Sequence, residues 1–368
     1  MLWEHEVVGS NPIVPTTFFT IRMYFKSVIL DSMAYAMPDE VWSSAKIEDA
    51  LKPLYQRLNL PYGRLEQMTG IYERRHWASD TLPSTVAIEA GERLLQKAQI
   101  DRNAIDVLIH ASVCRNRLEP ATAAYVHQGL KLSEKTQIFD LSNACLGVLN
   151  AIIVGASMIE AGSARSVLIV SGENGRSLLD NTIQTLNQDP HLTRKTLKPY
   201  FANLTIGSGA IALLLRSAKE VSTPKPLILG GVVRTDSSAN QLCEGNASVS
   251  GLAMQTNATA LLEAGIQLSS SAWQDFKKEL DWDETTPQHI ITHQVGYQHQ
   301  KRIYEALHLD IEKDFSTFQM FGNTGSVALP LSLCKANEEG CIHNCEKILL
   351  LGIGSGLSTA MLGLLWQA

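Results

Sequence analysis

The stretch IFDLSNACLGVLN, residues 138–150, joins an apolar run, a few small residues, one cysteine and a segment that favours helix. This pattern predicts a strand, a tight turn and a helix, with Cys145 at the turn and close to the helix N-terminus. The free N–H groups and the dipole of a helix N-terminus favour negative charge, so we expect a lowered pKa for the Cys145 thiol and a reactive thiolate. A buried structural cysteine is the alternative, and this stretch alone does not decide between the two.

Predicted strands and helices alternate on both sides of this turn, which indicates the α/β class. The order of elements is repeated after the segment STPKP at 222–226, so we expect two duplicated halves, residues 23–222 and 223–368. Residues 173–200 are polar and irregular, and we interpret them as a loop with helical pieces that is inserted in the first half. The clearest predicted strands are 24–33, 105–112, 166–172, 205–215, 227–234, 289–293, 348–356 and 357–365, and the clearest helices are 43–58, 84–98, 257–280 and 298–307.

The composition is that of a soluble globular protein, with 45% hydrophobic and 18% charged residues. The net charge is −6 and lysines and arginines form no cluster, so no basic surface is available to attract nucleic acid. No uncharged apolar run approaches the roughly 20 residues of a membrane span. We therefore expect neither a nucleic-acid partner nor a membrane-spanning segment.

The six cysteines include no CxxC pair, which fits reduced thiols in the cytoplasm better than a disulfide framework. Cys341 and Cys345 flank His343, but this spacing matches no usual zinc module, and we expect no bound metal. The glycine run LGIGSGL at 351–357 does not open a predicted helix. It is therefore no dinucleotide fingerprint, and we expect no nicotinamide or flavin cofactor.

Residues 1–22 differ in character from the chain that follows. Within them, VVGSNPIVPTTFF resembles the conceptual translation of a transfer-RNA gene. We interpret residues 1–22 as a non-native extension and Met23 as the true start. The intact mass of the natively expressed protein tests this interpretation.

Two residues of catalytic type fall at predicted chain turns in the second half. His293 ends the predicted strand 289–293, and Asn323 lies in the glycine-rich turn 321–326. Because α/β sheets build their sites at the ends of strands, we expect both side chains to approach Cys145. A lone histidine is more often structural, so this expectation depends on all three residues together.

Three charged residues of the first half have ordinary interpretations of their own. Arg74 and Arg75 follow one another, and a solvated face is the default for such a pair, although a guanidinium also suits a phosphate. Glu119 precedes Pro120 at a predicted helix start, where a carboxylate usually interacts with the helix dipole.

Together, several ordered motifs give the chain from about Met23 onward a family resemblance. It resembles the thiolase-superfamily condensing enzymes of the ketoacyl-ACP synthase III branch. The motifs are TGIYERRHWA (69–78), FDLSNACLG (139–147), LTIGSGAIALLL (204–215), THQ (292–294), FGNTGSVALP (321–330) and LGIGSGLSTAML (351–362).

The resemblance implies a five-layered αβαβα thiolase fold and a homodimer formed through the first half. It also implies that Cys145 carries an acyl group, that the N–H groups of Cys145 and Gly354 stabilise an oxyanion, and that His293 and Asn323 donate to the second thioester. Arg74 or Arg75 would contact CoA. The substrate would be a thioester of CoA or of acyl carrier protein, and no further cofactor is implied.

Within this branch, two motifs resemble enzymes that join two long acyl chains head to head. The sequence reads HQVGYQH from His293, where ordinary synthases read HQAN, and it reads RLEP at 117–120, where ordinary synthases have an apolar residue in place of Glu119. The resemblance implies that Glu119 acts across the dimer interface as the base that removes an α-proton. A decarboxylating 3-oxoacyl-ACP synthase III, which uses malonyl-ACP, is the main alternative and needs no such base.

Three further alternatives fit the sequence less well. A degradative thiolase requires a second cysteine in the C-terminal glycine loop, where this chain has Ser355. A hydroxymethylglutaryl-CoA-synthase-like enzyme also pairs a cysteine with a glutamate, but the length and the other motifs of such enzymes match this chain less well. A non-catalytic partner subunit typically lacks the cysteine that is present here.

Overall fold

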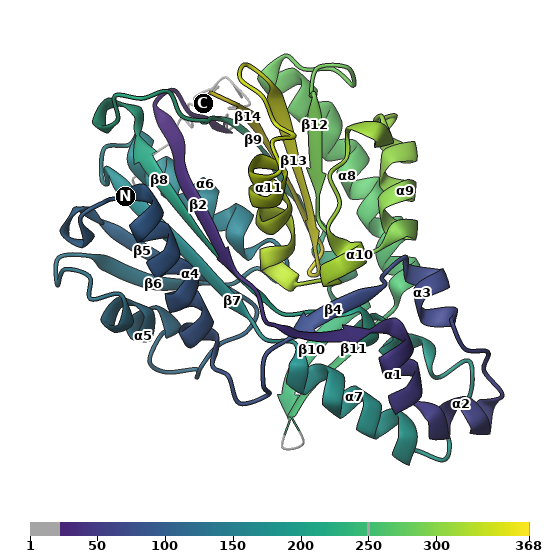
Figure 1. The fold of residues 1–368 in the computed structure, drawn as a ribbon. Coiled ribbons are helices and arrows are strands. Elements are labelled where there is room, and N and C mark those ends of the chain that lie inside the picture. Colours follow the sequence, from purple (N-terminus) through teal and green to yellow (C-terminus); the bar gives the residue numbers. More distant parts are fainter. Residues whose placement is uncertain (1–22, 249–250, 368) are drawn as a thin grey trace, which may run out of the picture.

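The computed structural model describes residues 23–248 and 251–367 (Figure 1). Residues 1–22, which the sequence suggests are a non-native extension, lie outside the described residues. Across the described part of the chain, no helix is both long enough and apolar enough to cross a membrane.

The centre of the molecule is a ten-stranded mixed sheet with the strand order β12-β13-β14-β9-β2-β8-β7-β5-β6, to which the short β1 adds by pairing with β9. Most of these strands are buried along their length, which explains their runs of Val, Ile, Leu and Ala. The strands are β1 (Met23–Tyr24), β2 (Val28–Ala36), β5 (Val107–Ala111), β6 (Gln137–Leu141), β7 (Ser166–Glu173), β8 (Gly209–Ser217), β9 (Leu227–Thr235), β12 (His289–Thr292), β13 (Lys347–Gly354) and β14 (Ser358–Leu365).

The sheet consists of two halves with the same pattern. In the first half, β6, β5 and β7 run parallel, and β8 and β2 follow antiparallel. In the second half, β12 and β13 run parallel, and β14 and β9 follow antiparallel. Between the two halves, β2 pairs with β9 at Ile29 and Leu227, and β1 pairs with β9 at two further positions. The repeated strand order confirms the duplication that the alternation of elements predicts.

Helices lie on both outer faces of the sheet and between its two halves (Figure 1). The buried faces of α6 and α11 share one apolar core with strands of both halves. Outer helices α4 and α5 pack on the first half, and α8 and α9 pack on the second. These helices are α4 (Pro83–Ala98), α5 (Thr122–Gly129), α6 (Gly147–Glu160), α8 (Ala258–Leu280), α9 (Tyr297–Leu307) and α11 (Ala328–Glu338). The result is the predicted αβαβα layering.

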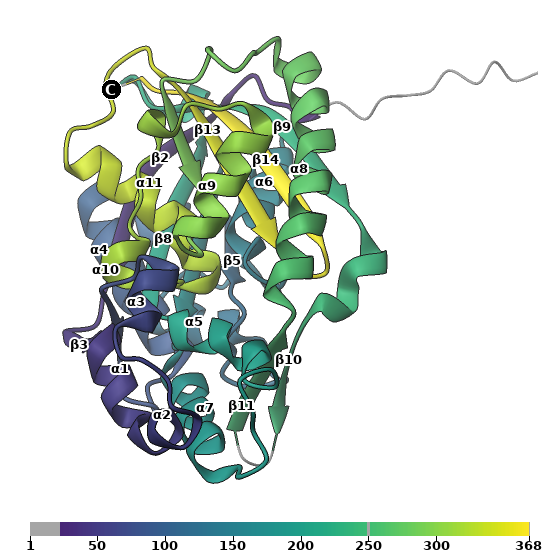
Figure 2. The same cartoon turned by 90° about the vertical axis from the view of Figure 1, so that its right-hand side faces the viewer.

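A smaller group of elements gathers at one end of the molecule (Figures 1 and 2). In the insertion at 173–200, the predicted helical pieces include one regular helix, α7 (Arg176–Gln188), which buries Leu178, Leu179, Thr182 and Leu186 on one face. The hairpin of β10 and β11 was not predicted. The elements of this end are β3 (Glu40–Ser43), α1 (Ser44–Ala50), α2 (Lys52–Leu58), α3 (Arg64–Thr69), β4 (Glu73–His76), α7, β10 (Cys243–Ser248), β11 (Gly251–Thr256) and the short α10 (Phe318–Phe321).

Candidate active site

Cys145 lies at the tight turn between β6 and α6, as the sequence predicts. Helix α6 begins at Gly147, two residues beyond the cysteine. Ala144 has φ +45°, in the left-handed region that residues with a Cβ rarely adopt, and the N–H of Leu146 donates to the carbonyl of Asn143 over 2.9 Å. This sharp turn presents Cys145 at its tip.

The expected lowering of the Cys145 pKa is wrong. Burial raises the pKa of the Cys145 thiol to about 12, and the negative charge of Glu173 adds to the effect. The prediction included only the effect of the helix N-terminus. It did not include the packing of the fold around the sulfur or the charge of Glu173, both of which raise the pKa. In the free protein at neutral pH, Cys145 is therefore a thiol.

Gly354, the last residue of β13, lies against the cysteine turn. A Cβ added at Gly354 would sit 3.4 Å from the backbone nitrogen of Leu146 and 3.0 Å from its side chain. Gly354 therefore lies in close contact with the cysteine turn, and a larger residue here would crowd the side chain of Leu146. The resemblance implies that the N–H group of Gly354, at this position beside the turn, is an oxyanion donor.

His293 directly follows β12 and is buried. Its backbone N–H donates to the carbonyl of Leu351 on β13 over 2.9 Å. Leu351 is three residues before Gly354 on the same strand, so His293 lies beside the strand that leads to Gly354. Burial, together with a smaller effect of the charge of His299, lowers the pKa of His293 to about 3. The imidazole is therefore neutral at physiological pH, and its Nδ1 atom has no hydrogen-bond partner among the described residues.

Asn323 lies in the turn between α10 and α11. Its backbone carbonyl accepts from Gly207 and its backbone N–H donates to Thr205, both over 2.9 Å. The side-chain Oδ1 accepts from the N–H of Gly325 over 3.0 Å. Because the oxygen is used in this way, the Nδ2 group is left free to donate to a substrate oxygen.

Contacts between their elements bring these residues to one region. A Cβ added at Gly147 would lie 3.6 Å from the Cβ of Ser326, so the start of α6 packs against the turn that carries Asn323. The Oε1 atom of Gln294 accepts from the N–H groups of Thr317 and Phe318, which ties the end of β12 to α10. Gln294 and Ser326 were not singled out from the sequence, and their only signal is their place beside the catalytic-type residues.

Glu119 occupies a different position from the other candidates. It is exposed in the loop that leads from β5 to α5, next to Leu118, which is 93% exposed. Its side chain makes no hydrogen bond or ion pair with any other described residue. The structure of one chain therefore leaves this carboxylate free for a partner.

The two arginines of β4 differ sharply. Arg74 is fully buried, and its guanidinium donates to Ser44 Oγ and to the carbonyl of Leu204, each over 2.9 Å. The prediction of a CoA contact is therefore corrected for Arg74, which is enclosed by the fold. Arg75 is partly exposed, contacts Glu73 over 3.8 Å, and remains the candidate of the pair.

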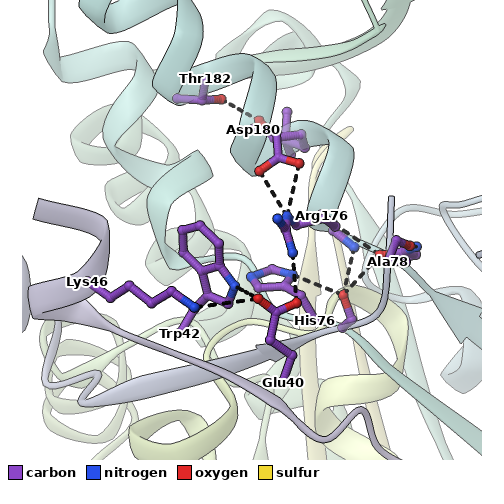
Figure 3. A network of polar contacts seen from close by, with 12 residues as sticks. Glu40, Trp42, Lys46, His76, Ala78, Arg176, Asp180 and Thr182 are labelled. Atoms are coloured by element: carbon purple, nitrogen blue, oxygen red, sulfur yellow. Dashed lines mark hydrogen bonds and ion pairs between the residues drawn. The ribbon is translucent and has the colours of Figure 1, made fainter. Parts of the chain in front are cut away.

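A charged cluster beside β4 is built from residues that the sequence did not single out (Figure 3). The guanidinium of Arg176 pairs with Asp180 and Glu40, each over 2.9 Å, and lies 4.7 Å from the centre of the Trp42 ring, on which Lys46 also stacks. These charges satisfy one another. The cluster connects the start of α7 to β3. Both of its cations, Lys46 and Arg176, are paired with carboxylates, so neither is free to bind a ligand.

A metal site requires several ligating side chains in one place. Within residues 23–248 and 251–367, no three His, Cys, Asp or Glu side chains gather as metal ligands would. The LGIGSGL run joins the antiparallel strands β13 and β14 and opens no helix, as predicted.

Comparisons with known proteins agree with this geometry. Residues 139–225 match the family described as 3-oxoacyl-[acyl-carrier-protein] synthase III, and residues 278–366 match its C-terminal counterpart. The acyl-CoA:acyl-CoA alkyltransferase of Shewanella oneidensis is 36% identical over 94% of this chain and 100% of its own length. The enzyme of the same name from Xanthomonas campestris is 32% identical over 94% of this chain and 100% of its own length.

Solved structures give the same result. Xanthomonas campestris OleA bound to cerulenin superposes with a TM-score of 0.89 at 32% identity, covering 94% of this chain and 98% of that one. The same OleA has been solved with lauric acid and lauroyl-CoA, and as variants of one glutamate, one cysteine and one histidine, the residue types selected here at Glu119, Cys145 and His293. The chain therefore belongs to the acyl-CoA:acyl-CoA alkyltransferase, or OleA, family of thiolase-fold acyltransferases.

Proposed function

We propose that this protein condenses two long-chain acyl-CoA molecules into a 2-alkyl-3-ketoacyl-CoA, without decarboxylation and through an acyl-Cys145 intermediate. The observation that carries the proposal is the free carboxylate of Glu119 in a chain that also brings Cys145, His293 and Asn323 to one region. Decarboxylation would supply a carbanion without a base, whereas proton abstraction from an unactivated acyl chain requires one.

In the first half-reaction, the sulfur of Cys145 attacks the thioester carbonyl of one acyl-CoA and CoA leaves with the thiol proton. The N–H groups of Cys145 and Gly354 stabilise the oxyanion of the tetrahedral intermediate. Because the resting cysteine is a thiol, the proton must leave Cys145 as the sulfur attacks, and the departing CoA thiolate is its final acceptor.

In the second half-reaction, Glu119 removes an α-proton from a second acyl-CoA. The neutral imidazole of His293 and the Nδ2 group of Asn323 donate hydrogen bonds to the thioester oxygen as the enolate forms. The enolate carbon attacks the carbonyl of the acyl-cysteine, a carbon–carbon bond forms, and Cys145 leaves as a thiolate. The proton that Glu119 removed is finally returned to Cys145, which restores both the thiol and the carboxylate.

We propose a homodimer in which each chain supplies Glu119 to the site of its partner. Strand β6 forms the edge of the sheet in one chain, and its side chains from Ile138 to Leu141 are only half-buried. An edge strand with unpaired backbone groups is a ready surface for pairing with a second copy. The loop that carries Glu119 precedes α5, which packs beside β6.

The remaining parts of the proposal concern the substrate and the compartment. Arg75 is our candidate for the CoA phosphates, because its guanidinium is partly exposed and weakly paired. We propose that no cofactor other than the CoA of the substrate takes part. All six cysteines are free, which fits a reducing cytoplasm as the place of the reaction.

The test is the release of CoA from lauroyl-CoA as the sole substrate. The proposal predicts CoA release together with a β-keto thioester or the ketone that forms from it. Condensation that occurs only after malonyl-ACP is added would instead support the decarboxylating 3-oxoacyl-ACP synthase III activity.

A further inference from the structure

Glu173, at the end of β7, is a buried carboxylate with no cationic partner among the described residues. Its Oε1 atom accepts from the N–H of Val113 over 2.8 Å, and its Oε2 atom accepts from the N–H of Cys114 over 3.0 Å. Oε1 also accepts from the hydroxyl and the N–H of Ser326, over 2.5 and 3.3 Å. One side chain thus connects two loops that are distant in the sequence.

Both of these loops lead to residues of the proposed second half-reaction. Val113 and Cys114 begin the loop that carries Glu119. Ser326 lies three residues after Asn323, and a Cβ added at Gly325 would be 3.2 Å from Oε1 of Glu173, so the turn is in contact with the carboxylate. Glu173 therefore holds both the Asn323 turn of its own site and the start of the loop whose Glu119 is proposed to serve the partner's site.

The far end of the Glu119 loop is held by a second carboxylate. The oxygens of Asp140 accept from the N–H groups of Thr122 and Ala123, each over 2.8 Å, at the start of α5. Asp140 also lies 3.7 Å from His110 Nδ1. The loop from 113 to 121 is thus anchored at both ends by side chains of the sheet.

Buried hydroxyl groups connect the two anchors. His110 Nε2 and the hydroxyl of Ser112 are 3.1 Å apart, Ser112 and Ser171 are 2.8 Å apart, and Ser171 and Ser326 are 2.9 Å apart. Ser326 then reaches Glu173. Each of these side chains is at most 5% exposed, so water does not compete with the chain of contacts.

From this arrangement, and on the basis of the proposed function, we infer that Glu173 is a positioning residue for the second half-reaction. It holds the Asn323 turn of its own site and, through the same carboxylate, the start of the loop that carries Glu119 to the partner's site. It does not touch the substrate carbonyl or the α-carbon in this account. A misplacement of about 1 Å between reacting groups costs on the order of 100-fold in rate, so loosening this connection should reduce condensation far more than acylation of Cys145.

Glu173 also acts on Cys145 through its charge. Glu173 and Cys243 are the two titratable groups whose charges raise the pKa of Cys145, in addition to burial. Removal of this negative charge should therefore lower the pKa of Cys145. This effect provides a readout that a merely structural loss would not produce.

The experiment compares Glu173→Gln with Glu48→Gln as a matched control. Glu48 is also a buried carboxylate, and it accepts from the N–H groups of Gly63 and Leu65 and from the hydroxyl of Tyr55, at the end of the molecule that carries α1 and α3. Three quantities are measured for each full-length protein: single-turnover acylation of Cys145 by lauroyl-CoA, formation of the condensed product, and the pH profile of Cys145 alkylation by iodoacetamide.

We expect Glu173→Gln to acylate Cys145 within about threefold of the unmodified protein but to condense on the order of 100-fold more slowly. Its alkylation profile should shift to lower pH, so that alkylation at a fixed pH below the pKa becomes faster. Glu48→Gln should show neither change. Equal losses in both variants, or unimpaired condensation in Glu173→Gln, would overturn the inference.

A second variant keeps the test decisive if Glu173→Gln does not fold. Ser326→Ala breaks the same connection and leaves the Glu173 charge in place, so it should slow condensation and leave the alkylation profile unchanged. Normal condensation in Ser326→Ala would contradict the positioning role. Failure of the proposed function is distinguishable, because it appears in the unmodified protein as the absence of product from lauroyl-CoA alone, whereas the alkylation shift still reports on Glu173.

Discussion

The replacement of Glu119 by glutamine separates the two half-reactions most cleanly. Glutamine keeps the size of the side chain and removes its ability to accept a proton at neutral pH. Glu119 is exposed, and in the described part of the chain its side chain has no hydrogen-bond or ion-pair partner. We therefore expect Glu119→Gln to change the free energy of unfolding by no more than about 0.5 kcal/mol.

The expected effect on condensation is much larger. A positioned general base contributes typically about 10²–10⁴-fold in rate, which corresponds to roughly 2.7–5.4 kcal/mol of transition-state stabilisation at about 1.36 kcal/mol per factor of ten. Acylation of Cys145 needs no base at this position and should stay within about threefold. The assay follows the acyl-enzyme by intact mass and the condensed product by extraction, under the same conditions and with urea unfolding as the stability control.

Two results would refute this reasoning. Condensation by Glu119→Gln at a rate within tenfold of the unmodified protein would remove Glu119 from proton abstraction. Loss of the acyl-enzyme together with condensation, in a protein of unchanged stability, would place Glu119 in the first half-reaction instead.

Three further predictions concern the other candidate residues. Cys145→Ser should keep the fold and lose at least about 10³-fold in turnover, because an alkoxide is far harder to form than a thiolate; turnover near that of the unmodified protein would contradict the nucleophile assignment. The ring of His293, followed by NMR and assigned by comparison with His293→Gln, should remain neutral from pH 9 down to pH 5, because its pKa is about 3; a titration near pH 6.5 would contradict the described burial. Arg74→Ala should lower the free energy of unfolding by about 3 kcal/mol, because Ser44 and Leu204 lose a buried donor, whereas Arg75→Ala should leave stability within about 0.5 kcal/mol and raise the KM for acyl-CoA; equal stability losses would contradict the distinction between the two arginines.

Much of the layered fold could be predicted from the sequence because its strands and helices are regular and apolar on the expected faces. The turn at Cys145, the strand that ends at His293 and the strand pair around LGIGSGL were all predicted near the observed positions. Helical pieces were expected within 173–200, but the bounds of α7 were not, because its apolar residues are few among many polar ones, although Leu178, Leu179, Thr182 and Leu186 share one face. The hairpin of β10 and β11 has little apolar alternation and gave no clear signal.

The site was predictable in its residue types but not in its electrostatics. Local sequence places Cys145 at a helix start, and that alone suggests an acidic thiol. The opposing effects come from burial and from Glu173, which is 28 residues away in the sequence and reaches the site only through the fold. Likewise, the sequence presents Arg74 and Arg75 as a pair, and only the packing of β4 shows that their side chains face opposite environments.

The most direct test of the central claim is the mass of the product formed from acyl-CoA labelled with carbon-13 at its carbonyl, with unlabelled malonyl-ACP present in the same reaction. Head-to-head condensation predicts a β-keto thioester that carries two labelled carbons, because both chains come from acyl-CoA. A product with one labelled carbon would show that malonyl-ACP supplies the second unit, and it would contradict the proposed reaction and the role of Glu119 as its base.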